Sequence, residues 1–108
     1  MRKIEWTPDG VNSLNEILEY YHDRAGENVA NNIYGKILKE IELLEVEEIR
    51  TKQTQELKDI GIYDVYELTI NPWKVYYKIS DDNKRVFILF VLVWKKKFRR
   101  NINIKSNR

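Results

Sequence analysis

Residues 72–93 read "PWKVYYKISDDNKRVFILFVLV", and this stretch decides the fold of the chain. Its first part alternates between an apolar face with Trp73, Val75, Tyr77 and Ile79 and a second face with Lys74, Tyr76 and Lys78. A period of two residues is typical of a strand with one buried face. Residues 80–83 form a turn signal. Residues 85–93 are apolar on both faces, which predicts a central strand that is covered on both sides.

The residues before this stretch extend the same pattern. Residues 64–70 alternate more weakly, and Asn71-Pro72 is a turn signal, so three antiparallel strands in a meander are predicted. If the turn pairs Ile70 with Trp73, Glu67 lies on the same face as Lys74. Residues 50–61 show no clear period and are predicted to form a loop or an irregular turn.

The N-terminal half predicts a short strand followed by two helices. Residues 3–6 read as the strand, and Thr7-Pro8-Asp9 reads as a helix start, because threonine caps and proline suits the first helical position. Two apolar stripes at helical spacing follow, with Gly26 between them. The predicted fold class is α+β, in which an antiparallel helical hairpin covers one face of the sheet.

Composition narrows the class of protein. The 108 residues predict one domain, with no cysteine for disulfides or thiolate metal sites and no signal-peptide core. The longest apolar run is far shorter than the roughly 20 residues of a membrane helix, so a cytoplasmic protein without a membrane partner is expected. No metal or cofactor is expected, because neither a histidine–carboxylate set nor a glycine-rich loop occurs in the sequence. His22 is expected to be structural, near a helix end.

The charges are unevenly distributed along the chain. Residues 94–108 hold seven basic residues and no acidic one, whereas residues 1–93 hold 12 basic and 17 acidic residues. Residues 95–108 are therefore predicted to be a basic C-terminal tail. Such a tail either binds a polyanion or an acidic partner, or keeps an aggregation-prone strand soluble.

The order of elements and three motifs resemble the RelE/ParE toxins of type II toxin–antitoxin systems. The motifs are Trp-Thr-Pro at residues 6–8, Tyr-Glu-Leu-Thr-Ile at residues 66–70 and Pro-Trp-Lys-Val-Tyr-Tyr-Lys-Ile at residues 72–79. The resemblance covers nearly the whole chain. It implies a growth-inhibiting toxin, of a kind associated with plasmid stabilization, that a cognate antitoxin neutralises by wrapping an extended tail around it. It further implies a target that is either messenger RNA on the ribosome or DNA gyrase.

The resemblance also implies where a ribonuclease site would lie. Lys74 stands in place of an arginine that contacts the scissile phosphate in ribonuclease members, Glu67 would be the base, and Lys95 and Lys96 would add positive charge. RNA cleavage needs proton transfer and neutralisation of the phosphate charge, but lysine lacks the bidentate fork of arginine. The residues themselves are also consistent with an exposed lysine at position 74 and a surface ion pair at Glu67.

The tail holds the remaining candidate contacts. Lys97, Arg99 and Arg100 would contact a target or polyanion, and Trp94 replaces the small residue that usually opens this segment in the family. Ribonuclease members often have a histidine or tyrosine just beyond the basic segment, and residues 98–102 occupy that zone here. Phe98 can stack on a base but cannot transfer a proton. We therefore expect a ParE-like toxin that inhibits an essential machine such as DNA gyrase. The alternatives are a ribosome-dependent mRNA endonuclease and an inactive module that only binds the antitoxin.

Overall fold

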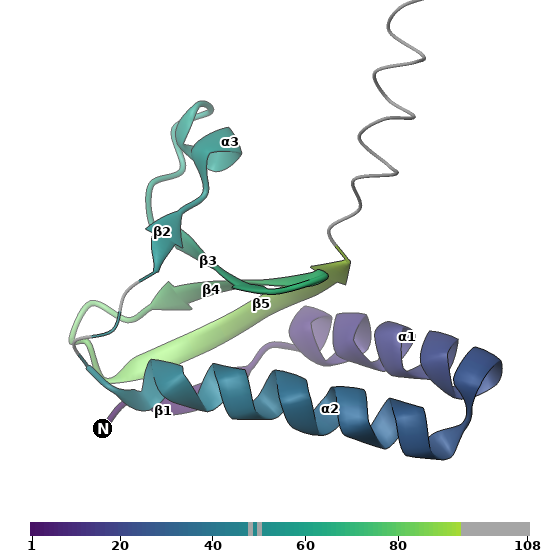
Figure 1. Cartoon of the computed structure of the whole chain (residues 1–108). Helices are drawn as coiled ribbons and strands as arrows, with labels where there is room; N and C mark the ends of the chain where they lie inside the picture. Colours follow the sequence, from purple (N-terminus) through teal and green to yellow (C-terminus); the bar gives the residue numbers. More distant parts are fainter. Residues whose placement is uncertain (48, 50, 94–108) are drawn as a thin grey trace, which may run out of the picture.

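The computed structural model describes residues 1–47, 49 and 51–93 of the chain. The elements follow in the order β1 (Lys3–Trp6), α1 (Pro8–Ala25), α2 (Glu27–Glu42), η1 (Leu43–Glu45), β2 (Lys52–Gln53), α3 (Gln55–Lys58), β3 (Val65–Ile70), β4 (Trp73–Ile79) and β5 (Arg85–Val93). Figure 1 shows α1 and α2 on one face of the sheet and the short α3 on the opposite side. The predicted α+β class, with its helical hairpin and meander, is confirmed.

One sheet contains all five strands in the order β1-β5-β4-β3-β2. Strands β3, β4 and β5 form the antiparallel meander, and Ile70 pairs with Trp73 as predicted. Strand β1 pairs in parallel with β5, with Lys3 opposite Arg85. A register irregularity opposite Tyr76 and Tyr77 leaves one extra residue in β5, which is the arrangement of a β-bulge.

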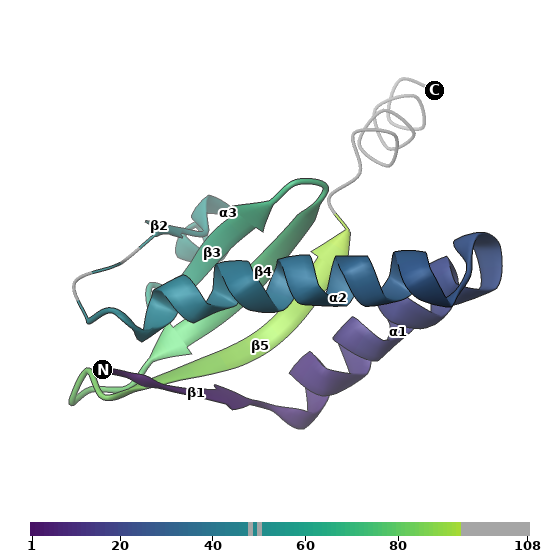
Figure 2. The ribbon, with the colours of Figure 1, turned by 60° about the horizontal axis from the view of Figure 1, so that its bottom comes forward.

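The helical hairpin begins and turns where the sequence predicts. The Gly10 backbone N–H donates a hydrogen bond of 3.0 Å to Thr7 Oγ1, which caps α1. Gly26 ends this helix with a φ of 93°, a conformation that glycine adopts without a steric penalty. Helix α2 follows at once, and Figure 2 shows the two helices side by side against the sheet. The core between these layers consists of Leu14, Ile17, Ile37, Ile41, Leu44, Ile70, Trp73, Val75, Tyr77, Val86, Ile88 and Val91.

The start of α1 lies directly against β5. Thr7 Oγ1 donates a hydrogen bond of 2.8 Å to the carbonyl oxygen of Ile88. A Cβ atom on Gly10 would collide with the same carbonyl group. Position 10 therefore requires glycine because the helix backbone and the strand backbone touch there.

Two sequence predictions are wrong in the sheet. Residues 50–61 are not an irregular loop throughout, since they contain β2, which pairs with β3, and the helix α3. These elements have two and four residues, which is too short to show a period. Strand β5 is interior as predicted but is not covered on both faces, because Phe90 and Leu92 are 43% and 47% exposed.

A buried arginine ties the first strand to the end of the hairpin. Arg2 is 2% exposed. Its guanidinium donates hydrogen bonds of 2.7–3.3 Å to Asn83 Oδ1 and to the backbone carbonyls of Leu44, Val46, Glu47 and Ile49. The first of these carbonyls lies in η1, which continues α2, and the other three lie beyond η1. The positive charge therefore lies at the C-terminal end of the helical segment, where it is stabilising. Arg2 thus fixes the path of the chain between the helical layer and β2.

Candidate functional site

The polar candidate residues lie on the outer face of the sheet, opposite the helical hairpin. The strand register aligns four side chains in one row across β2, β3, β4 and β5. These are Lys52, Glu67, Tyr76 and Phe90. The adjacent row consists of Thr69, Lys74 and Leu92. Glu67 and Lys74 therefore share a face, as the sequence predicts.

Glu67 is a buried carboxylate between two lysines. Its side chain is 6% exposed, with Oε2 3.4 Å from Lys74 Nζ and Oε1 3.7 Å from Lys52 Nζ. A buried carboxylate is costly unless an opposite charge or hydrogen bond compensates it. The Lys74 side chain is only 16% exposed, so the reading of an exposed lysine and a surface ion pair is wrong. Lys74 and Glu67 form a largely buried pair.

The phenol of Tyr76 lies beside this pair. Burial raises the pKa of Tyr76, and the negative charges of Glu67 and Glu56 raise this pKa further. The phenol is therefore protonated at neutral pH and can donate a hydrogen bond. The two rows together thus offer the ammonium group of Lys74, the carboxylate of Glu67 and the neutral hydroxyl of Tyr76 within one small area.

The candidates of the basic tail lie outside the described residues. These are Trp94, Lys95, Lys96, Lys97, Phe98, Arg99 and Arg100. The last described residue of β5, Val93, pairs with Trp73, next to the pairing of Lys74 with Leu92. The tail therefore begins at the end of β5 at which Lys74 lies.

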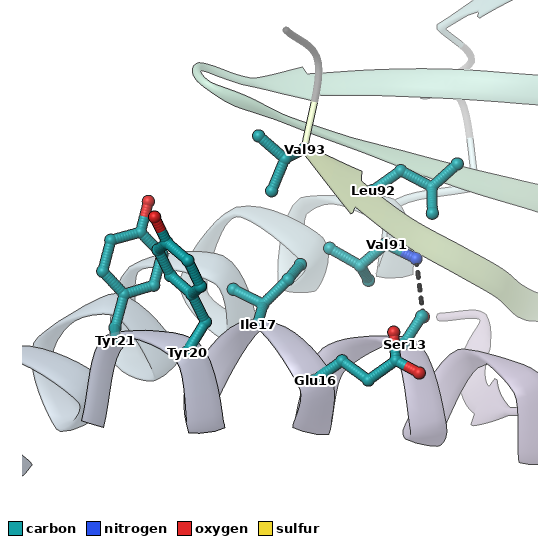
Figure 3. Close-up of a pocket in the computed structure, with 8 residues that line it drawn as sticks. All are labelled: Ser13, Glu16, Ile17, Tyr20, Tyr21, Val91, Leu92 and Val93. Carbon is teal, nitrogen blue, oxygen red and sulfur yellow. Dashed lines mark hydrogen bonds between the residues drawn. The ribbon is translucent and has the colours of Figure 1, made fainter. Parts of the chain in front are cut away.

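A second candidate surface lies between α1 and the end of β5. Strand β1 pairs with β5 only as far as Ile88, and α1 borders the rest of this edge. The Val91 backbone N–H donates a hydrogen bond of 2.9 Å to Ser13 Oγ. In Figure 3, Ile17 lies between Ser13 and the side chains of Tyr20 and Tyr21 along α1. The two tyrosines face Val93 across a pocket of about 360 Å³. This α1–β5 pocket combines aromatic side chains with a strand edge.

Sequence reasoning missed Lys52, Arg2 and Ser13. Lys52 lies in a stretch without a period, so its position opposite Glu67 had no visible signal. The side chain of His22 is exposed and 3.8 Å from Asp23, in the last turn of α1. Within residues 1–47, 49 and 51–93, no cluster of three histidine, aspartate or glutamate residues could hold a metal ion. No helix in that same part of the chain is long and apolar enough to cross a membrane.

Comparisons with known proteins identify relatives of this architecture. The family model of the ParE toxin of type II toxin–antitoxin systems, parDE, matches residues 4–98. A structure of the chromosomal ParDE system from P. aeruginosa has a TM-score of 0.73 and 18% identity, and the match covers 88% of this chain and 98% of that chain. The isolated E. coli RelE toxin has a TM-score of 0.56 and 14% identity over the full length of both chains. The intact E. coli RelBE toxin–antitoxin complex has a TM-score of 0.53 and 15% identity, over 89% of this chain and 100% of that chain. A search among curated proteins finds no significant match.

Proposed function

Since the chain belongs to the ParE toxin family of type II toxin–antitoxin systems, we propose that it arrests growth by binding an essential machine, DNA gyrase, without cutting RNA. In this proposal the protein acts in the cytoplasm and is neutralised by a cognate antitoxin. The similar ParDE and RelBE structures are toxin–antitoxin systems, which supports an antitoxin as the partner.

The ion pair of Glu67 and Lys74 is the observation that carries the proposal. A phosphate bound at Lys74 would come close to the Glu67 carboxylate, since the two groups are 3.4 Å apart. At an effective dielectric constant of about 20, two negative charges about 6 Å apart repel by roughly 3 kcal/mol. Glu67 therefore opposes the binding of the substrate that a ribonuclease would have to hold. A toxin that binds a protein target has no such conflict.

The α1–β5 pocket supports the antitoxin part of the proposal. Exposed strand edges and apolar helix faces accept extended or helical segments of partners. Tyr20, which lines this pocket, is exposed, and the guanidinium carbon of Arg24 lies 4.0 Å from the centre of its ring. Aromatic residues of this kind are enriched where proteins bind each other. Purification of a co-expressed neighbouring gene product together with the chain tests this surface, and a soluble chain that is harmless without any partner argues against it.

A ribosome-dependent endoribonuclease is the second candidate function. It is favoured by the proximity of Lys74, Glu67 and the protonated Tyr76 on one face, because phosphate binding and proton transfer need groups of these kinds. Under this alternative, Glu67 is the base and Lys74 the phosphate contact, with Lys95 and Lys96 adding charge. An inactive module that only binds the antitoxin would use the α1–β5 pocket alone.

Induced expression in cells separates the three functions. We expect growth arrest, intact transcripts by primer extension and a loss of supercoiling activity in extracts. Codon-phased cuts that disappear in Lys74→Ala would instead establish the ribonuclease, with a loss on the order of 100-fold in cleavage and retained activity in Lys74→Arg. Lys78→Ala is the matched control, because Lys78 lies on the same strand and face and pairs with Asp64 at 3.0 Å. Normal growth with a bound antitoxin would identify the inactive module.

A further inference from the structure

The outer face also contains an apolar groove, which borders the site described above at Tyr76. The groove has a volume of about 410 Å³ and lies between α3, the loop after it and the strands β3, β4 and β5. Its lining residues are Thr54, Glu56, Leu57, Ile62, Val65, Tyr76, Leu89, Phe90 and Leu92. Ile62, Phe90 and Leu92 are exposed large apolar side chains. We call this site the α3 groove.

The α3 groove has few polar groups, which include the hydroxyl of Thr54 and the carboxylate of Glu56. Thr54 is buried, and its Oγ1 has no hydrogen-bond partner among the described residues. A buried hydroxyl without a partner destabilises a fold, so its presence in the lining of a groove points to a partner that arrives with a ligand. Glu56 also lines the groove, and its negative charge is close enough to raise the pKa of the Tyr76 phenol.

The lysines near the α3 groove do not make it a site for anions. Lys74 and Lys52 lie beside the Glu67 carboxylate, and Lys78 lies 3.0 Å from Asp64. Within the described part of the chain, Glu56 is the one charged residue that lines the groove. The groove is therefore apolar along β5 and negatively charged at α3.

We propose that the α3 groove binds a segment of a protein partner in which a large apolar side chain stands next to a basic residue. The apolar side chain lies against Phe90, Leu57 and Leu92, and the basic group reaches Glu56 and the free oxygen of Thr54. The inference rests on the proposed function, because it assigns the outer face to a protein partner rather than to RNA.

The charge preference of the α3 groove is measured with two small probes that have similar apolar parts but opposite charges. Phenethylammonium and hydrocinnamate are titrated separately into the full chain, and the backbone amide shifts of Tyr76, Phe90 and Leu92 are followed by NMR. We expect the ammonium probe to bind about three- to five-fold tighter, the size of one charge contact at a protein surface. Equal affinity, or tighter binding of the carboxylate, would overturn the proposal.

Three variants test the assigned contacts. Glu56→Gln is expected to abolish the preference between the probes, whereas Glu42→Gln, at an exposed site on α2, keeps it. Phe90→Ala weakens both probes to a similar extent. Thr54→Val weakens the ammonium probe but leaves thermal stability unchanged or higher, since it removes a buried hydroxyl without a partner. A lower stability of Thr54→Val with unchanged binding would show that the hydroxyl is structural and would refute its role.

Competing occupants give distinct results. Saturable binding of a short single-stranded RNA at the amides of the α3 groove would overturn the proposal in favour of RNA. Tighter binding of the ammonium probe to Phe98→Ala than to the unmodified chain would show that the tail of this chain competes for the groove, and it would also overturn the proposal. Neither probe reports on gyrase or on transcripts, so this inference and the proposed function can fail independently.

Discussion

Replacing Arg2 by methionine tests whether the buried guanidinium holds the fold together. The guanidinium serves five acceptors, which are Asn83 Oδ1 and four backbone carbonyls. A hydrogen bond to a charged donor contributes about 1.5–3 kcal/mol. If water satisfies Asn83 Oδ1 and about half of the four abandoned carbonyls, the two carbonyls that remain give an expected loss in the free energy of unfolding of about 3–6 kcal/mol. That is a large share of the roughly 5–15 kcal/mol by which domains are stable.

Urea unfolding followed by circular dichroism measures this loss. Arg2→Lys is expected to lose roughly half as much, because it keeps the charge but presents one nitrogen instead of a planar fork. Lys3→Met is the matched control, since Lys3 is the exposed neighbour, and its stability is expected to change by less than about 0.5 kcal/mol. An Arg2→Met chain within about 1 kcal/mol of the unmodified chain would refute the reasoning, since the six hydrogen bonds to these five acceptors would then contribute no net stability.

Two further predictions concern the packing of α1 and the outer face. Gly10→Ala is expected to destabilise the fold by about 1–3 kcal/mol in thermal melts, because its Cβ would collide with Ile88 O, whereas Gly35→Ala, with open space around it, is expected to stabilise α2 by about 0.5–1 kcal/mol. Equal effects of both changes would contradict the close contact. Absorbance titration is expected to place the pKa of Tyr76 above the ordinary value of about 10, and Glu67→Gln is expected to lower it, because the Glu67 charge is one cause of the shift. Since the pKa of Tyr76 is higher in the folded than in the unfolded state, the stability linked to its protonated form is complete below the unfolded pKa and is lost as the pH rises through the folded pKa. A Tyr76→Phe chain with the same loss of stability at alkaline pH would disprove the assignment of this loss to Tyr76.

The sequence predicts well those features that short-range rules determine. Thr7, Pro8 and Gly26 define the ends of α1 through local backbone chemistry, and the alternation around Val75 defines β4. The face shared by Glu67 and Lys74 follows from one turn and the period of a strand. These predictions required no knowledge of distant contacts.

The features that the sequence did not predict depend on distant contacts. Arg2 meets acceptors more than 40 residues away, such as Leu44 O and Asn83 Oδ1, so its burial has no local signal. The burial of Lys74 depends in the same way on neighbours from other strands. The exposure of Phe90 depends on α3 being too short to cover β5. An apolar strand sequence shows that its residues can be buried, but it does not show that another element covers them.

The parallel pairing of β1 with β5 has a consequence for the order in which the molecule can assemble. The first strand has its sheet neighbour at residues 85–88, so a growing chain must bring together segments about 80 residues apart before β1 joins the sheet. Such long-range pairing slows folding, because the entropy of closing the loop is lost before the contacts form. A ribosome that is still translating the middle of the message therefore holds a chain without its complete sheet. We expect ribosome-stalled chains to resist proteolysis only when residue 93 has left the ribosome, and equal protection of chains stalled before β5 would exclude this order of events.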